Sequence, residues 1–100
     1  MFIAIVDLRT TASNRPIALN ELADQSAAVR AMAGNRRFAV LVPPGDDQKL
    51  TVLHEWDDYA QFQGYLASDT FARFASTVRT LATEPPVSRR FEAHLVEQTA

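Results

Sequence analysis

The chain has 100 residues, of which 47% are hydrophobic and 22% are charged, and its formal net charge at pH 7 is −2. This length suits one domain with a core that needs no crosslinks, so we expect a single domain over residues 1–100. The absence of cysteine excludes disulfides, thiol nucleophiles and cysteine-bound metals, and it is typical of a cytoplasmic protein.

The chain begins with an apolar run, Phe2–Val6, that is followed at once by the charge of Asp7. This run is too short for a signal peptide or a membrane-spanning helix, so no membrane partner is expected. No block of basic residues is present, so the sequence does not indicate a nucleic-acid partner.

The first predicted element is a strand over Phe2–Arg9, whose two alternating sets of positions are both largely apolar. A helix follows, with Asn14 as its expected N-cap and Pro16 in its first turn. It is predicted to run to about Ala33, because Gly34 suits the position just after a helix. Its predicted inward stripe is Leu19, Leu22, Ser26, Val29 and Ala33.

The second and third predicted strands are Arg37–Val42 and Lys49–Trp56, and the Pro43–Asp47 cluster between them predicts a hairpin connection. Asp58 is an expected cap for a short helix over Tyr59–Ala67. Ser68 is the expected cap of a longer helix that ends before Pro85, and Ser88–Val96 is the predicted fourth strand. The longer helix carries apolar residues at helical spacing, namely Phe71, Phe74, Val78 and Leu81.

The order β-α-β-β-α-β predicts an α+β, ferredoxin-like fold with a four-stranded antiparallel sheet and helices on one face only. The other face must then carry one of the two apolar sets of the first strand, and a bare apolar face of this size indicates a partner. We therefore predict a homodimer with the two sheets packed face to face. Glu55 is expected at this interface. Arg90 is its assigned partner, although alternation alone leaves the choice between Arg89 and Arg90 open.

Aromatic residues concentrate in the second half of the chain, where seven of the nine lie between Trp56 and Phe91. They form either a packed core or the wall of a pocket. His54 and Trp56 are the candidate catalytic residues, because an imidazole titrates near neutral pH and an indole offers a flat wall and an N–H donor. Candidate substrate-binding residues are Val52, Phe62, Tyr65, Phe71, Phe74 and Arg73.

Each of these residues also has a plainer interpretation. His54 could be a hydrogen-bonded residue at a strand end, and the aromatic residues could be ordinary core. The two histidines are 40 positions apart, with no carboxylate at ligand spacing, so no metal site is predicted.

Four segments resemble the antibiotic biosynthesis monooxygenase domain, a member of the dimeric α+β barrel superfamily: Asn35–Phe38, His54–Trp56, Phe62–Phe71 and Pro85–Phe91. The resemblance covers nearly the whole chain. It implies a pocket between the sheet and the helices of each subunit. For some members it implies oxygenation of aromatic polyketides or oxidation of quinols without a metal, flavin or other cofactor.

The chain differs from the specialised members of the family. The polyketide oxygenases carry Asn, Tyr and Arg at or near the positions of Val52, Phe62 and Ser76, while Arg73 and Arg79 lie one turn from the last. Haem-degrading and sugar-processing members carry a histidine at the positions of Ala75 and Tyr65, respectively. The resemblance leaves three alternatives: a cofactor-independent monooxygenase acting on a small aromatic, quinol or polyketide-like substrate; a non-catalytic, ligand-binding or stress-associated homodimer; or a packed interaction module.

Overall fold

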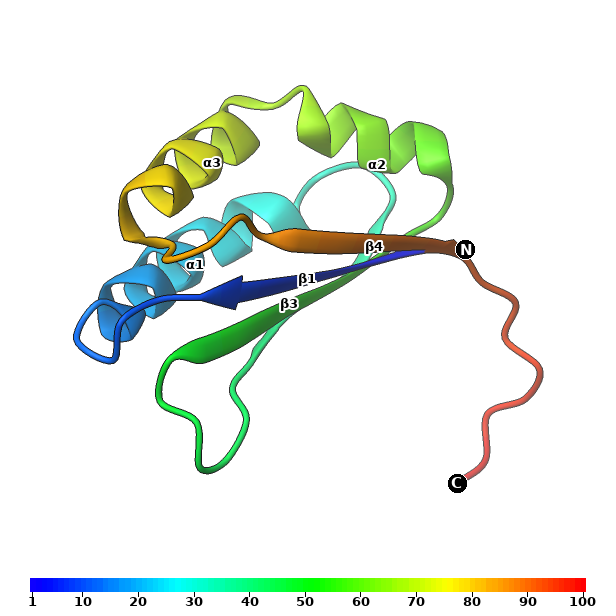
Figure 1. Ribbon diagram of the computed structural model, residues 1–100. Coiled ribbons are helices and arrows are strands. Elements are labelled where there is room, and N and C mark those ends of the chain that lie inside the picture. The colour runs from blue at the N-terminus through cyan, green and yellow to red at the C-terminus, as the bar shows by residue number, and fades with distance from the viewer.

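The computed structural model describes residues 1–100, which form one antiparallel sheet with helices on one of its faces (Figure 1). The strands lie in the order β2-β3-β1-β4. This arrangement confirms the predicted ferredoxin-like α+β fold. The elements are β1 (Phe2–Arg9), α1 (Arg15–Arg30), β2 (Asn35–Leu41), β3 (Lys49–Trp56), α2 (Tyr59–Leu66), α3 (Asp69–Leu81) and β4 (Val87–Glu92).

The two central strands, β1 and β3, carry the floor of the core. Side chains of a strand alternate between the two faces of its sheet, and every second side chain of β3 is buried beneath the helices. These four residues are Leu50, Val52, His54 and Trp56. On β1, Phe2, Ala4 and Leu8 are buried on the same side. The bounds of both strands agree with those predicted from the sequence.

Two of the three helices begin at the predicted caps. The Asp58 side chain accepts a hydrogen bond from the Gln61 backbone N–H at 2.8 Å, and the Ser68 hydroxyl accepts one from the Phe71 N–H at 3.1 Å. Such bonds satisfy N–H groups that the first turn of a helix leaves free. None of the helices is long and apolar enough to cross a membrane.

The first helix begins after Asn14 with Pro16 in its first turn, as predicted, but it differs from its prediction in the capping bond and at its C-terminal end. The Asn14 side chain makes no capping bond, and the Thr11 hydroxyl instead accepts from the Asn14 backbone N–H at 3.1 Å. The helix ends at Arg30 rather than near Ala33. Leu22 and Val29 are buried as predicted, while Ala18 and Gln25 are buried in place of the predicted Leu19 and Ser26.

Strand β4 is shorter than predicted and ends at Glu92 rather than at Val96. It is an edge strand whose only neighbour is β1, and β1 begins at Phe2. Its last pair is Glu92 with Phe2, and the Ala93 N–H bonds to the Met1 carbonyl just beyond it. The C-terminal residues therefore run away from the sheet as an extended segment (Figure 1).

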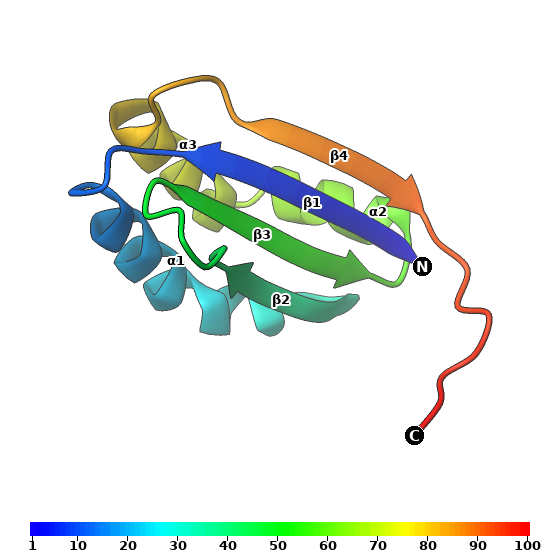
Figure 2. The ribbon, with the colours of Figure 1, turned by 60° about the horizontal axis from the view of Figure 1, so that its bottom comes forward.

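The face of the sheet opposite the helices is uncovered and will be called the open face (Figure 2). Its centre is apolar, because Ile3, Ile5 and Leu53 project from β1 and β3 on this side and are only half-buried. This confirms that one apolar set of the first strand points away from the helices. Alternation from Ile5 and Leu53 adds Ala39, Leu41, Val87 and Phe91 to the open face.

The register corrects the assignment of Arg90 to this face. Arg90 lies beside Ala4, which is covered by the helices, whereas Arg89 lies beside Ile5 on the open face. Arg89 bonds there to Asp7 at 3.3 Å. Glu55 is on the open face as predicted, opposite Ile3 and Arg37, and has no ion pair within the chain.

Gly34 joins α1 to β2 with a φ of +79°, and a Cβ atom built there would lie 2.5 Å from the Cγ atom of Gln61. Gly34→Ala should therefore lower the free energy of unfolding by about 2 kcal/mol or more, through a strained backbone and a steric clash. Urea denaturation measures this loss.

Two other glycines are matched controls. Gly45 has a φ of +82° with no atom near its Cβ position, so Gly45→Ala should cost about 1 kcal/mol for the backbone alone. Gly64 lies in α2 with open space around it, so Gly64→Ala should stabilise by about 0.5–1 kcal/mol. Equal losses at Gly34 and Gly45 would contradict a role for the Gln61 contact.

Candidate functional site

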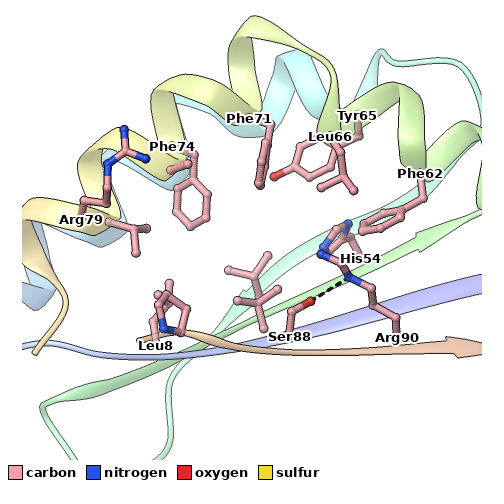
Figure 3. Close-up of a pocket in the computed structure, with 15 residues that line it drawn as sticks. Leu8, His54, Phe62, Tyr65, Leu66, Phe71, Phe74, Arg79, Ser88 and Arg90 are labelled. Atoms are coloured by element: carbon pink, nitrogen blue, oxygen red, sulfur yellow. Dashed lines mark hydrogen bonds between the residues drawn. The ribbon is translucent and has the colours of Figure 1, made fainter. Parts of the chain in front are cut away.

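A cavity of about 270 Å³ lies between the sheet and the helices α2 and α3 (Figure 3). Fifteen residues line it, and ten of them are hydrophobic. The floor comes from β1 and β3, through Val6, Leu8 and Val52, and one side comes from β4. The roof consists of side chains from α2 and α3, namely Phe62, Tyr65, Leu66, Phe71, Phe74, Ala75 and Val78.

The break between α2 and α3 determines where the side chains that form the roof of the cavity lie. The Ser68 hydroxyl donates to the Tyr65 carbonyl at 2.6 Å and accepts from the Phe71 N–H at 3.1 Å, so one side chain ends α2 and starts α3. The turn brings the rings of Tyr65 and Phe71 edge to face, with 5.3 Å between their centroids. Such pairs hold aromatic rings at defined angles, and the two helices therefore present several rings to one space.

His54 forms one end of the cavity, and its protonation is set by Trp56. The Trp56 Nε1–H donates to Nδ1 of His54 at 2.8 Å, and both side chains are buried. An indole N–H is only a donor, so Nδ1 must be unprotonated and the proton of the neutral ring is on Nε2. Nε2 makes no hydrogen bond within the chain. Every fully buried side-chain nitrogen or oxygen atom does make one, so Nε2 is not fully buried. The Nε2–H group is therefore reached from the cavity.

Burial keeps both titratable groups of this region neutral at pH 7. Desolvation, with a smaller contribution from the positive charge of Arg90, lowers the pKa of His54 to about 4. Desolvation raises the pKa of Tyr65 to about 12, so its phenol keeps its proton. Two neutral hydrogen-bond donors therefore line the cavity, an imidazole N–H and a phenolic O–H.

Arg90 lies next to His54 at the same end of the cavity, and Arg79 lies at the opposite end (Figure 3). The Arg90 guanidinium is 5.0 Å from the ring centroid of Phe62, and its Nε atom donates to the Ser88 hydroxyl at 3.2 Å. A guanidinium over an aromatic face is attracted to the ring. The lining contains no aspartate or glutamate, so its formal charge is that of its two arginines.

Most of the residues predicted to bind substrate do line this cavity. They are Val52, Phe62, Tyr65, Phe71 and Phe74, and the catalytic candidate His54 lines it with them. The remaining predicted residues lie elsewhere. Trp56 is fully buried behind His54 and packs on Tyr65, with 5.4 Å between ring centroids. Arg73 is exposed on the outside of α3, where it bonds to Glu21 of α1 at 3.1 Å.

The cationic side chains of the cavity are Arg79, which the resemblance offered only as a neighbour of the family's arginine position, and Arg90, which was assigned to the dimer interface. Ser88 and Arg90 alternate along β4 and so share a face, and this signal was present in the sequence. The face they share became clear only from the register of β4 against β1. Arg79 is six residues after Arg73, a spacing that places the two on different sides of α3.

The profile described as "Antibiotic biosynthesis monooxygenase" matches residues 1–77. Among curated proteins, none matches the chain significantly. Solved structures share the fold at low identity. A proposed antibiotic biosynthesis monooxygenase of Deinococcus radiodurans superposes with a TM-score of 0.91 and 16% identity, covering 100% of this chain and 99% of that one.

A proposed antibiotic biosynthesis monooxygenase of Nitrosomonas europaea gives a TM-score of 0.87 at 14% identity, over 93% of this chain and 98% of that one. Rv0793 from Mycobacterium tuberculosis gives 0.86 at 17% identity, over 98% of both chains. These likenesses establish the fold, and the profile covers more than half of the sequence. The chain therefore belongs to the antibiotic biosynthesis monooxygenase family.

Proposed function

We propose that this protein is a monooxygenase that oxidises a small, flat aromatic molecule, of the quinol or polyketide type, in the cavity beneath α2 and α3. The observation that carries the proposal is the combination of an apolar, ring-lined cavity of about 270 Å³ with polar donors at one end. Ligand sites are typically lined in this way, by apolar walls with a few placed polar groups. The volume favours a substrate of few fused rings.

The proposed reaction uses molecular oxygen directly. A ring carbon activated by a neighbouring hydroxyl or carbonyl loses a proton, and the electron-rich carbon that remains bonds to one atom of O₂. For an activated methylene group, that oxygen stays as a carbonyl, and the second leaves with two hydrogens as water. The apolar walls of Phe62, Phe71 and Phe74 suit both O₂ and the substrate ring. The donors His54 and Tyr65 suit the oxygen on which negative charge develops.

The role of His54 changes in this proposal. The sequence suggested a general base, but the Trp56 N–H occupies Nδ1, and the remaining nitrogen carries a proton. His54 therefore serves as a donor to substrate oxygen, and the proton that the substrate loses passes to solvent. The same observation favours a second candidate function, in which the protein binds the aromatic molecule without turning it over.

We also propose that the open face packs against a second copy of the chain. Its half-buried centre of Ile3, Ile5 and Leu53 is apolar, and charged side chains such as Glu55 and Arg89 surround it. A two-fold contact would let each copy cover the same surface of the other. Covering an apolar patch of this kind is the usual reason for a stable homodimer.

The catalytic proposal predicts O₂ consumption with a panel of hydroquinones and anthrones, measured with an oxygen electrode. Ala75 of α3 lines the cavity, and Ala75→Phe should fill it and reduce O₂ uptake by about tenfold or more. Ala72→Phe on the exposed side of the same helix is the matched control and should retain the wild-type rate. Ligand binding by the wild type without O₂ uptake would overturn the oxygenase proposal in favour of the binder.

The neutral His54 predicts a pH dependence of stability. Its pKa is about 4 in the folded protein and 6.5 in the unfolded chain, so only the unfolded chain takes up the proton between these values. The free energy of unfolding should therefore fall by about 3 kcal/mol as the pH drops from 6.5 to 4. His54→Gln should remove this part of the slope in urea titrations. His94→Gln, at an exposed site, should keep it; identical slopes in all three proteins would contradict the prediction.

The dimer proposal predicts that the wild type sediments at twice its chain mass. Leu53→Arg places a charge at the centre of the open face and should give a folded monomer, because buried unpaired charge is costly. Ala72→Arg adds the same charge to the exposed side of α3 and should remain a dimer. A wild-type protein that sediments as a monomer at micromolar concentration would refute the contact.

A further inference from the structure

We infer that the cavity binds its aromatic ligand as an oxygen anion, a phenolate or enolate, and that Trp56 positions His54 to donate a hydrogen bond to that anion. The inference rests on the proposed function and adds two things to it. These are the charge of the bound ligand and a positioning residue that does not itself reach the cavity.

The charge of the cavity is opposite to that of the whole chain. The protein carries a formal charge of −2, yet the cavity lining has two arginines and no carboxylate. The ion pairs of the structure involve Arg9, Arg36, Arg73, Arg89 and Lys49, and none involves Arg79 or Arg90. A cation beside apolar walls is stabilised by a counter-charge within a few ångströms. No residue of the lining supplies that charge to Arg79 or Arg90, and an anionic ligand would supply it.

The hydrogen-bonding groups around His54 point to the same ligand. Arg90 approaches it from β4 and contributes only N–H donors, and the neutral Tyr65 approaches from α2 and contributes a phenolic O–H that can donate to an anion. From α3, Arg79 lines the far end of the cavity. No acidic side chain faces His54 from β1, β3, β4, α2 or α3 within the lining. An N–H, an O–H and a guanidinium held together beside apolar walls stabilise negative oxygen more than freely moving water does.

Trp56 determines whether His54 can donate a hydrogen bond to the anionic ligand. An imidazole with a free Nδ1 exchanges its proton between the two ring nitrogens and can then present a bare Nε2 lone pair, which repels an anion. The Trp56 N–H at 2.8 Å prevents this, since Nδ1 must remain an acceptor. Trp56 is 0% exposed and packs on Tyr65 and Phe62, so the donor cannot turn away. It therefore acts through His54 and not by touching the ligand.

The consequence is a change in the ligand's own acidity. A hydroxylated aromatic that binds as ArO⁻ releases its proton to solvent, and the electron-rich form is then held next to the apolar walls. This supplies the ionised substrate that direct reaction with O₂ requires, without a base in the cavity. Charge recognition and activation of the substrate are thus the same event.

The test uses 4-nitrophenol, whose neutral and ionised forms absorb at different wavelengths. With protein in excess, the apparent pKa of the bound probe should be lower than in buffer by about one unit or more, equivalent to a tenfold preference for the anion. Arg90→Gln and Trp56→Phe should each reverse a large part of this shift. Arg73→Gln, outside the cavity, is the matched control and should leave it unchanged. A bound probe with an unchanged or raised pKa, or no binding of the probe, would overturn the inference.

A second measurement does not depend on the folding of any variant. Nitrogen-15 NMR of the wild-type protein at pH 7 should show His54 protonated at Nε2 and bare at Nδ1, and the reverse pattern would overturn the positioning role of Trp56. The outcomes also separate this inference from the oxygenase proposal. O₂ uptake without a shift in the probe overturns the inference alone, and a shifted probe without O₂ uptake overturns only the oxygenase.

Discussion

One hydrogen bond, from the Trp56 indole to Nδ1 of His54, fixes which nitrogen of the imidazole at the end of the cavity carries the proton. It lies within a single strand, between residues two positions apart, so it forms wherever β3 is correctly extended and covered. The bond converts a residue that usually acts as an acid or base into a fixed donor. The same burial that holds the pKa of His54 near 4 would strengthen its contact with the proposed ligand oxygen.

One face of the sheet lines the cavity, and the other is the open face. Every second residue of β3 is buried under the helices, and Leu53 and Glu55 between them look the other way. A slip of one residue in the register would exchange the cavity lining for the open face. The register is set by the hairpin at Pro43–Asp47 and by the match of β1 against β3 along their whole length. Fold specificity and site geometry therefore have a common origin.

Much of the fold was predictable because its signals are local. The alternation of β3 and the caps Asp58 and Ser68 are read within a few residues, and they were predicted correctly. The end of β4 was not, because Ser88–Val96 is uniformly compatible with a strand, whereas its pairing with β1 ends at Glu92 and Phe2. The end of an edge strand depends on its neighbouring strand, which here is distant in the sequence.

The site was predicted less completely for the same reason. The aromatic wall followed from helical spacing, and Phe62, Tyr65, Phe71 and Phe74 all line the cavity. The face of Arg90 depends on its pairing with Ala4, 86 positions earlier by their numbers in the chain, and spacing within β4 could not determine it. The role of Trp56 required the direction of one N–H bond, which no pattern of residue types contains.

Strand β4 combines two properties that have a joint consequence. It bonds to a single neighbour, every one of its residues is exposed, and it carries Ser88 and Arg90 into the side of the cavity. Backbone segments with one hydrogen-bonded neighbour and little burial open at the lowest free-energy cost in a fold. The guanidinium nearest to His54 thus lies on an easily detached edge of the sheet, so in the proposed complex the rate at which the ligand leaves and the strength of its ionic contact would both depend on this strand.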